Sequence, residues 1–84
     1  MPTNIKEFLA KHLPKQEDLL LAQAQQLLAD NNVNDAFTVI NKAYQLDSER
    51  ADIKLLLSDT YLQIGKVTEA ESLLATILMV DQDS

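Results

Sequence analysis

The chain has 84 residues, of which 46% are hydrophobic, and its formal net charge is -6 at pH 7. It contains no cysteine, which excludes disulfides, thiolate chemistry and zinc–thiolate sites within this sequence. An acidic surface repels phosphate backbones and anionic lipids, so we expect neither nucleic acid nor a membrane as a partner.

The composition favours an all-α fold in one small domain. Leu, Ala, Gln, Glu and Lys are strong helix formers, and one glycine and two prolines leave few turn signals. No apolar run is long enough to span a bilayer, and the N-terminus lacks the apolar core of a signal peptide. We therefore expect a cytoplasmic protein.

The first predicted helix lies in the opening segment "TNIKEFLAKHL". Its apolar residues Ile5, Phe8, Leu9 and Leu13 form one stripe at helical spacing. Pro14 ends this helix, because proline disfavours helical backbone in the residue before it and begins a new helix well. Residues 1–14 are thus predicted to be a helix and a linker.

Four further helices follow in chain order, joined by short turns. They are predicted at about 15–30, 34–46, 49–64 and 68–80. Ser48 is expected to cap the third of these four, and Thr68 with Glu71 has the spacing of a capping box for the last. Gly65 falls where a helix C-terminus needs positive φ.

The sequence repeats itself at an offset of 34 residues. Asp18 aligns with Asp52 and Asn31 with Gly65, and the apolar positions also fall in register. The alanines Ala36 and Ala70 share one position. A helix–turn–helix unit with this period is typical of the tetratricopeptide repeat, which predicts repeats over 15–48 and 49–84.

Small residues are expected where the two helices of each pair cross closely. These positions are held by Ala24 and Ala36 in the first pair and by Ser58 and Ala70 in the second. The consensus tryptophan and proline are missing; Leu20 and Lys54 hold the tryptophan position. The alternative interpretation is a generic helical bundle with accidental spacing.

The last helix is expected to leave an apolar edge. A solenoid repeat buries its apolar face only against a neighbour, and about three repeats are normally needed. Leu73, Leu74, Ile77, Leu78 and Met79 have no predicted partner. Either further repeats follow in a longer protein, or this edge forms a homodimer.

The segment "IKEFLAKHLPKQEDLLLAQAQQLLADNNVNDA" resembles bacterial thioredoxin–tetratricopeptide fusion proteins, the chaperedoxin (YbbN-type) family. The matching motifs are Ile5 to Pro14, Lys15 to Asp18, and the phrase "DQD" at Asp81 to Asp83. The resemblance implies that residues 1–14 correspond to the last helix of a thioredoxin-like domain. It further implies a co-chaperone that binds unfolded clients or chaperones.

The sequence offers little support for a catalytic or metal-binding site. His12 is the sole histidine, and an exposed place at a helix end explains it better than metal binding or catalysis. Asp81 and Asp83 lack the loop of a calcium site. Asp18 and Asp52 either form a ligand-facing row or stabilise helix starts through the dipole, and these two interpretations stay open.

An acyl carrier protein is a remote alternative, since such proteins are also small, acidic and helical. Their phosphopantetheine-bearing serine stands in an Asp-Ser-Leu motif. Here Asp47 and Ser48 are followed by Glu49, and that fold has no place for a period of 34 residues.

The residues expected to bind a partner lie on the first helix of each pair, which lines the concave groove of tetratricopeptide domains. They are Asp18, Leu21, Gln25, Leu28, Asp52, Leu55, Asp59 and Leu62. No cation is predicted among them, so a chaperone's terminal carboxylate would meet repulsion. Leucines among acids suit an extended apolar or basic segment instead.

We therefore predict a protein-binding module that is not an enzyme and needs no cofactor or metal. The alternative is a structural or oligomerisation segment of a larger protein.

Overall fold

A computed structural model describes residues 15–82 of the chain, with side chains for residues 15–78. Four helices follow one another: α2 (Gln16–Ala29), α3 (Val33–Leu46), α4 (Ala51–Gln63) and α5 (Val67–Gln82). The all-α prediction is confirmed for this part of the chain. The helix predicted within residues 1–14, and with it His12, lies outside the described residues.

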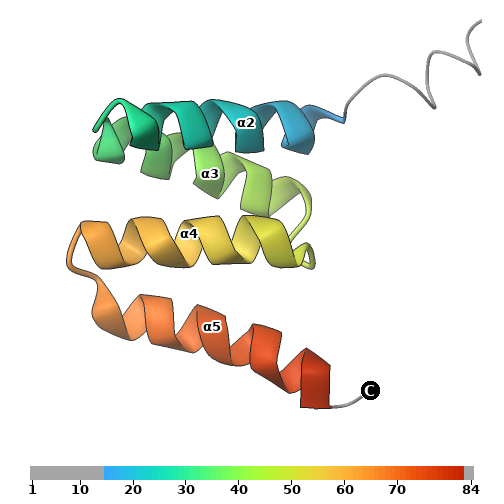
Figure 1. Cartoon of the computed structure of the whole chain (residues 1–84). Helices are drawn as coiled ribbons and strands as arrows, with labels where there is room; N and C mark the ends of the chain where they lie inside the picture. Colours follow the sequence, from blue (N-terminus) through green and yellow to red (C-terminus); the bar gives the residue numbers. More distant parts are fainter. Residues whose placement is uncertain (1–14, 83–84) are drawn as a thin grey trace, which may run out of the picture.

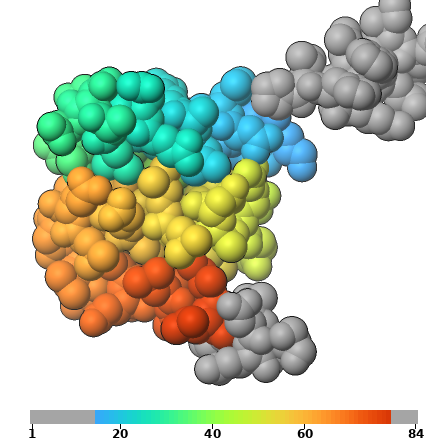
Figure 2. Space-filling model, viewed as in Figure 1, coloured from blue at the N-terminus to red at the C-terminus, as the bar shows by residue number. Residues whose placement is uncertain are grey.

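Each helix packs against the next one in the chain. Contacts join α2 to α3, α3 to α4 and α4 to α5, and successive helices run antiparallel (Figure 1). Figure 2 shows the atoms of α4, in yellow to orange, filling the surface between α2 and α5. The pairs α2–α3 and α4–α5 fall within residues 15–48 and 49–84, although the exact division of the chain stays a prediction.

The same turn ends the first helix of each pair. Asn31 and Gly65, 34 residues apart in the sequence, have φ of 66° and 86°. In the first turn Asn31 and Asn32 donate N–H groups back to the carbonyls of Leu28 and Leu27. The second repeats this Schellman pattern from Gly65 and Lys66. The expected positive φ at Gly65 is confirmed.

The small residues predicted at the crossings of the paired helices are buried. Ala24 and Ala36 are fully buried between α2 and α3, and Ser58 and Ala70 hold the matching positions in α4 and α5. Larger side chains make up the rest of the core. It contains Ile40, Ala43, Ile53, Leu57 and Leu73, with partly buried Leu20, Leu21, Phe37, Val39, Tyr44, Leu56 and Tyr61 packed against them.

Two predicted helix starts are wrong. Helix α4 has Arg50 rather than Ser48 at its N-cap, because the Asp47 carboxylate accepts the Glu49 N–H at 3.2 Å and holds that stretch in a turn. Helix α5 begins at Val67, one residue before Thr68, and the Lys66 carbonyl accepts the Ala70 N–H at 3.1 Å. The predicted box of Thr68 and Glu71 therefore lies inside the helix.

Two side chains differ from the expected pattern of burial. Leu46 is apolar but 52% exposed, because it is the last residue of α3. Lys54, at the consensus tryptophan position, is only 6% exposed. Its aliphatic stem thus takes a place that an aromatic ring fills in the consensus repeat.

Candidate protein-binding face

The predicted partner-binding residues lie on α2 and α4 and remain accessible to solvent. We call this set the α2–α4 face: Asp18, Leu21, Gln25, Leu28, Asp52, Leu55, Asp59 and Leu62. None of these residues is buried. Since α2 and α4 are the first helices of the two pairs, the repeat brings equivalent positions to corresponding places along parallel helices.

The leucines of the α2–α4 face differ in exposure. Leu55 is 52% and Leu62 is 47% exposed, whereas Leu21 and Leu28 are half-buried. Leu21 packs against the hydrophobic core and therefore gives only part of its surface to the face. The apolar surface available to a partner is consequently greater on α4 than on α2.

Arg50 lies between the two aspartates that recur in the repeat. Its guanidinium forms ion pairs with Asp18 at the start of α2 and with Asp52 at the start of α4. The second pair is bidentate, with Arg50 Nη2 at 2.7 Å from Asp52 Oδ2 and Arg50 Nε at 3.1 Å from Oδ1. One side chain therefore ties the first helices of both repeats together.

These hydrogen bonds shift the titration of all three groups. Bonds from Arg50 lower the pKa of both carboxyl groups, and the Lys15 N–H, bonded to Asp18 Oδ2 at 3.1 Å, adds to this effect at Asp18. The two carboxylates raise the pKa of Arg50 in turn, with Asp52 as the stronger cause. The aspartates are thus held as ionised partners of an arginine.

The role of Arg50 was not predicted from the sequence. Neither interpretation of Asp18 and Asp52 included a shared cation. Each carboxylate does accept a backbone N–H at its helix start, as a helix-stabilising role requires. Arg50 aligns with Gln16 at the 34-residue offset, so the repeat gives no sign of a special role. The acidic end of the α2–α4 face is consequently less negative than its aspartates alone imply.

Two cavities lie away from the α2–α4 face. One of about 410 Å³ is formed by α3, α4 and α5, and another of about 530 Å³ lies between the start of α2 and the end of α3. None of the eight predicted residues lines either of them. Sequence patterns could not indicate the first cavity, since three helices supply its walls.

Neither a metal-ligand cluster nor a membrane-spanning helix occurs among the described residues. That part of the chain holds no cluster of three or more His, Cys, Asp or Glu side chains suited to a metal ion. Its helices are too short or too polar to cross a bilayer. Asp83 lies beyond the described residues, and the position of the Asp81 side chain is not described.

Comparison with known proteins identifies the family. A family model described as "Tetratricopeptide repeat" matches residues 27–84, which is more than half of the chain. The chain therefore belongs to the tetratricopeptide repeat family, whose repeats generally mediate protein–protein interactions. The helix–turn–helix pairs, their closely packed small residues and the matching turns are the structural form of this repeat.

One relative extends the comparison. The chain is 36% identical over 73 residues to an uncharacterized protein of Haemophilus influenzae. The match covers 86% of this chain and 34% of the relative. The chain thus corresponds to about a third of that protein's length.

Proposed function

We propose that this chain binds an extended segment of a partner protein across the α2–α4 face. The observation that carries this proposal is the exposure of Leu55 and Leu62 on α4, on the helix that lines the concave side of tetratricopeptide domains. Apolar side chains of this size, aligned on one helix face, offer contact area to a partner's apolar residues.

The chemistry of the face favours an apolar or basic partner. Asp59 is exposed beside these leucines, and its carboxylate bonds only a neutral amide, that of Gln63, at 3.1 Å. The one guanidinium at the face, that of Arg50, is already shared by two carboxylates. A partner's carboxylate therefore finds no free cation among the described residues of this face, whereas a lysine or arginine finds an acid.

An NMR titration tests this proposal. A short peptide of alternating leucine and lysine is added to the isotopically labelled chain, and amide shifts are mapped onto the helices. We expect saturable shifts centred on Leu55, Asp59 and Leu62, and Leu28→Lys should weaken binding. Shifts confined to the outer edge of α5, with the α2–α4 face unaffected, would end the proposal.

A second candidate function is self-association through α5. Leu78 is 60% exposed, and Leu74 and Ile77 are half-buried on the same helix. These side chains suit a second copy of the chain or a following repeat. Sedimentation velocity over a range of concentrations tests this idea: a strict monomer at every concentration argues against a homodimer.

We further propose, from the sequence resemblance, that the chain is the repeat region of a cytoplasmic thioredoxin-like co-chaperone that binds and does not catalyse. Its support is the Ile5 to Pro14 segment, which resembles the end of a thioredoxin-like domain. The full open reading frame tests this proposal. A thioredoxin-like segment directly upstream is expected, and an unrelated upstream domain would refute it.

A further inference from the structure

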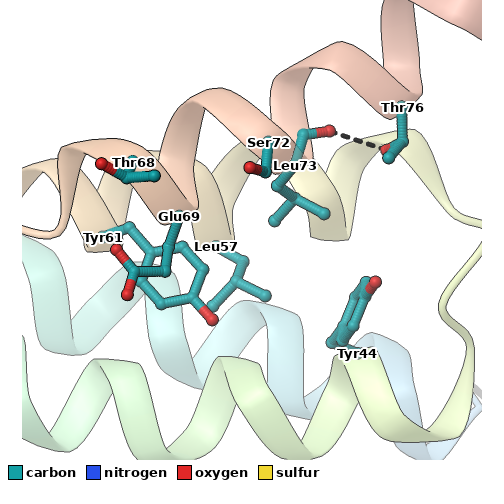
Figure 3. A pocket seen from close by; sticks show the side chains of 8 residues that line it. All are labelled: Tyr44, Leu57, Tyr61, Thr68, Glu69, Ser72, Leu73 and Thr76. Carbon is teal, nitrogen blue, oxygen red and sulfur yellow. Dashed lines mark hydrogen bonds between the residues drawn. The ribbon is translucent and has the colours of Figure 1, made fainter.

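The cavity of about 410 Å³ lies between α3 and α5 and has α4 as its floor (Figure 3). Tyr44 projects toward it from α3, and Leu57 and Tyr61 line it from α4. Helix α5 contributes Glu69, Ser72 and Leu73. Its volume falls in the range of small-molecule and side-chain pockets.

The cavity combines an apolar interior with acceptors at its mouth. Leu57 and Leu73 are 1% and 8% exposed and form the apolar part. Tyr44 and Tyr61 are half-buried, and the Tyr61 ring is held by Phe37, whose centroid lies 5.4 Å away. Glu69 and Ser72 are exposed, so their oxygen atoms can be reached from solvent.

Glu69 is the only charged residue among those that line this cavity. Within residues 15–78 both ion pairs involve Arg50, so Glu69 has no cationic partner in this part of the protein. It stands in the first turn of α5, where its carboxylate offsets the positive end of the helix dipole. An entering cation thus meets a carboxylate rather than an uncompensated dipole.

We propose that this cavity binds a lysine or arginine side chain presented by a partner protein. The aliphatic stem would pack on Leu57 and Leu73 between the tyrosine rings, whose electron-rich faces attract cations. The charged end would reach the Glu69 carboxylate and the Ser72 hydroxyl. An anionic side chain would be repelled by the same carboxylate, and a purely apolar one would gain no ionic contact with it.

The cavity is distinct from the α2–α4 face. At about 100° per residue, Leu57 and Tyr61 lie roughly 160° around α4 from the mean direction of Asp52, Leu55, Asp59 and Leu62. The two sites therefore use opposite sides of one helix. The cavity can bind a basic side chain whether or not the α2–α4 face binds a partner.

The test is a titration of the full chain with the capped peptide Ala-Ala-Lys-Ala-Ala. Binding is monitored through the NMR shifts of the backbone amides and the tyrosine rings. We expect saturable shifts centred on Tyr61, Glu69 and Ser72. Glu69→Gln should weaken binding about five-fold, as expected for loss of an ionic contact beside aromatic rings. Glu71→Gln is the matched control, since Glu71 is exposed on the same helix and does not line the cavity.

Peptides with norleucine or glutamate in place of lysine complete the design. Both should bind at least about five-fold more weakly than the lysine peptide. Equal binding of the norleucine peptide, equal losses in Glu69→Gln and Glu71→Gln, or shifts confined to the α2–α4 face would each overturn the proposal. An unchanged spectrum of each free variant shows that the helices are intact.

Discussion

Asp18 and Asp52, which occupy the same position in successive repeats, both form ion pairs with one arginine, Arg50. Arg50 stands directly before α4 and pairs with both carboxylates. The first helices of the two repeats are consequently joined by a polar link as well as by the core. The stacking of the two repeats therefore depends in part on the charges of Arg50, Asp18 and Asp52.

Loss of the shared arginine should destabilise the fold modestly. Because both pairs are partly exposed and screened by solvent, we expect Arg50→Gln to cause a small but measurable loss of stability. Urea denaturation measures the change, and a double-mutant cycle with Asp18→Asn should give a favourable coupling between the two side chains. A coupling of zero would show that the pair across the repeats contributes nothing.

The same link predicts a loss of stability in acid. The folded state lowers the pKa of Asp18 and Asp52 below the unfolded value of about 4, so their contribution is complete above that value. It disappears as the pH falls below about 4 and through the lower folded pKa of each carboxyl group. Thermal unfolding at several pH values should show a shallower acid slope in the doubly substituted Asp18→Asn, Asp52→Asn chain.

Asp59→Asn provides the control for this measurement. Its carboxylate bonds the neutral amide of Gln63 on the same helix and has no part in the Arg50 link. The acid slope of this variant should match that of the unchanged chain. Equal flattening in the Asp59 variant would mean that the slope reports overall charge rather than this link.

The close crossing of α4 and α5 should not tolerate a larger residue at Ala70. This alanine is fully buried, so Ala70→Leu should cost about 1–3 kcal/mol through overpacking. Ala75→Leu is the matched control, because Ala75 is exposed on the same helix and should change stability by less than about 0.5 kcal/mol. Urea denaturation compares the two variants, and similar costs would show that Ala70 does not set the helix spacing.

The turn at Gly65 should respond to its backbone conformation alone. A Cβ atom at this position meets nothing within 4 Å, yet φ is +86°. We therefore expect Gly65→Ala to cost about 1 kcal/mol from strain. Gly65→Asn should cost less, since Asn31 already adopts positive φ in the equivalent turn. Thermal unfolding distinguishes these outcomes; a larger loss for asparagine would contradict the equivalence of the turns.

Much of the fold could be predicted from residues whose role is local or periodic. The 34-residue period indicated the helix pairs, the buried Ala36 and Ala70, and the turn at Gly65, because each depends on spacing within one repeat. The first residues of α4 and α5 were predicted less accurately. Several nearby polar residues can satisfy a helix N-terminus, and tertiary contacts decide among them.

The polar contacts across helices escaped prediction for a different reason. Arg50 contacts a residue 32 positions away, and it aligns with a neutral glutamine in the other repeat. The cavity that includes Tyr44 and Glu69 is formed by three helices, so no single helix pattern indicates it. Both features depend on how the helix pairs are placed in space, which the period alone does not specify.

The most direct test of partner binding compares two exposed leucines. Leu55 and Leu78 are 52% and 60% exposed, on the α2–α4 face and on α5 respectively. Calorimetric titration with the alternating leucine–lysine peptide should show that Leu55→Lys weakens binding about ten-fold or more, whereas Leu78→Lys changes it less than about two-fold. Equal affinity for the Leu55→Lys and unchanged chains, or a loss only in Leu78→Lys, would contradict binding at the α2–α4 face.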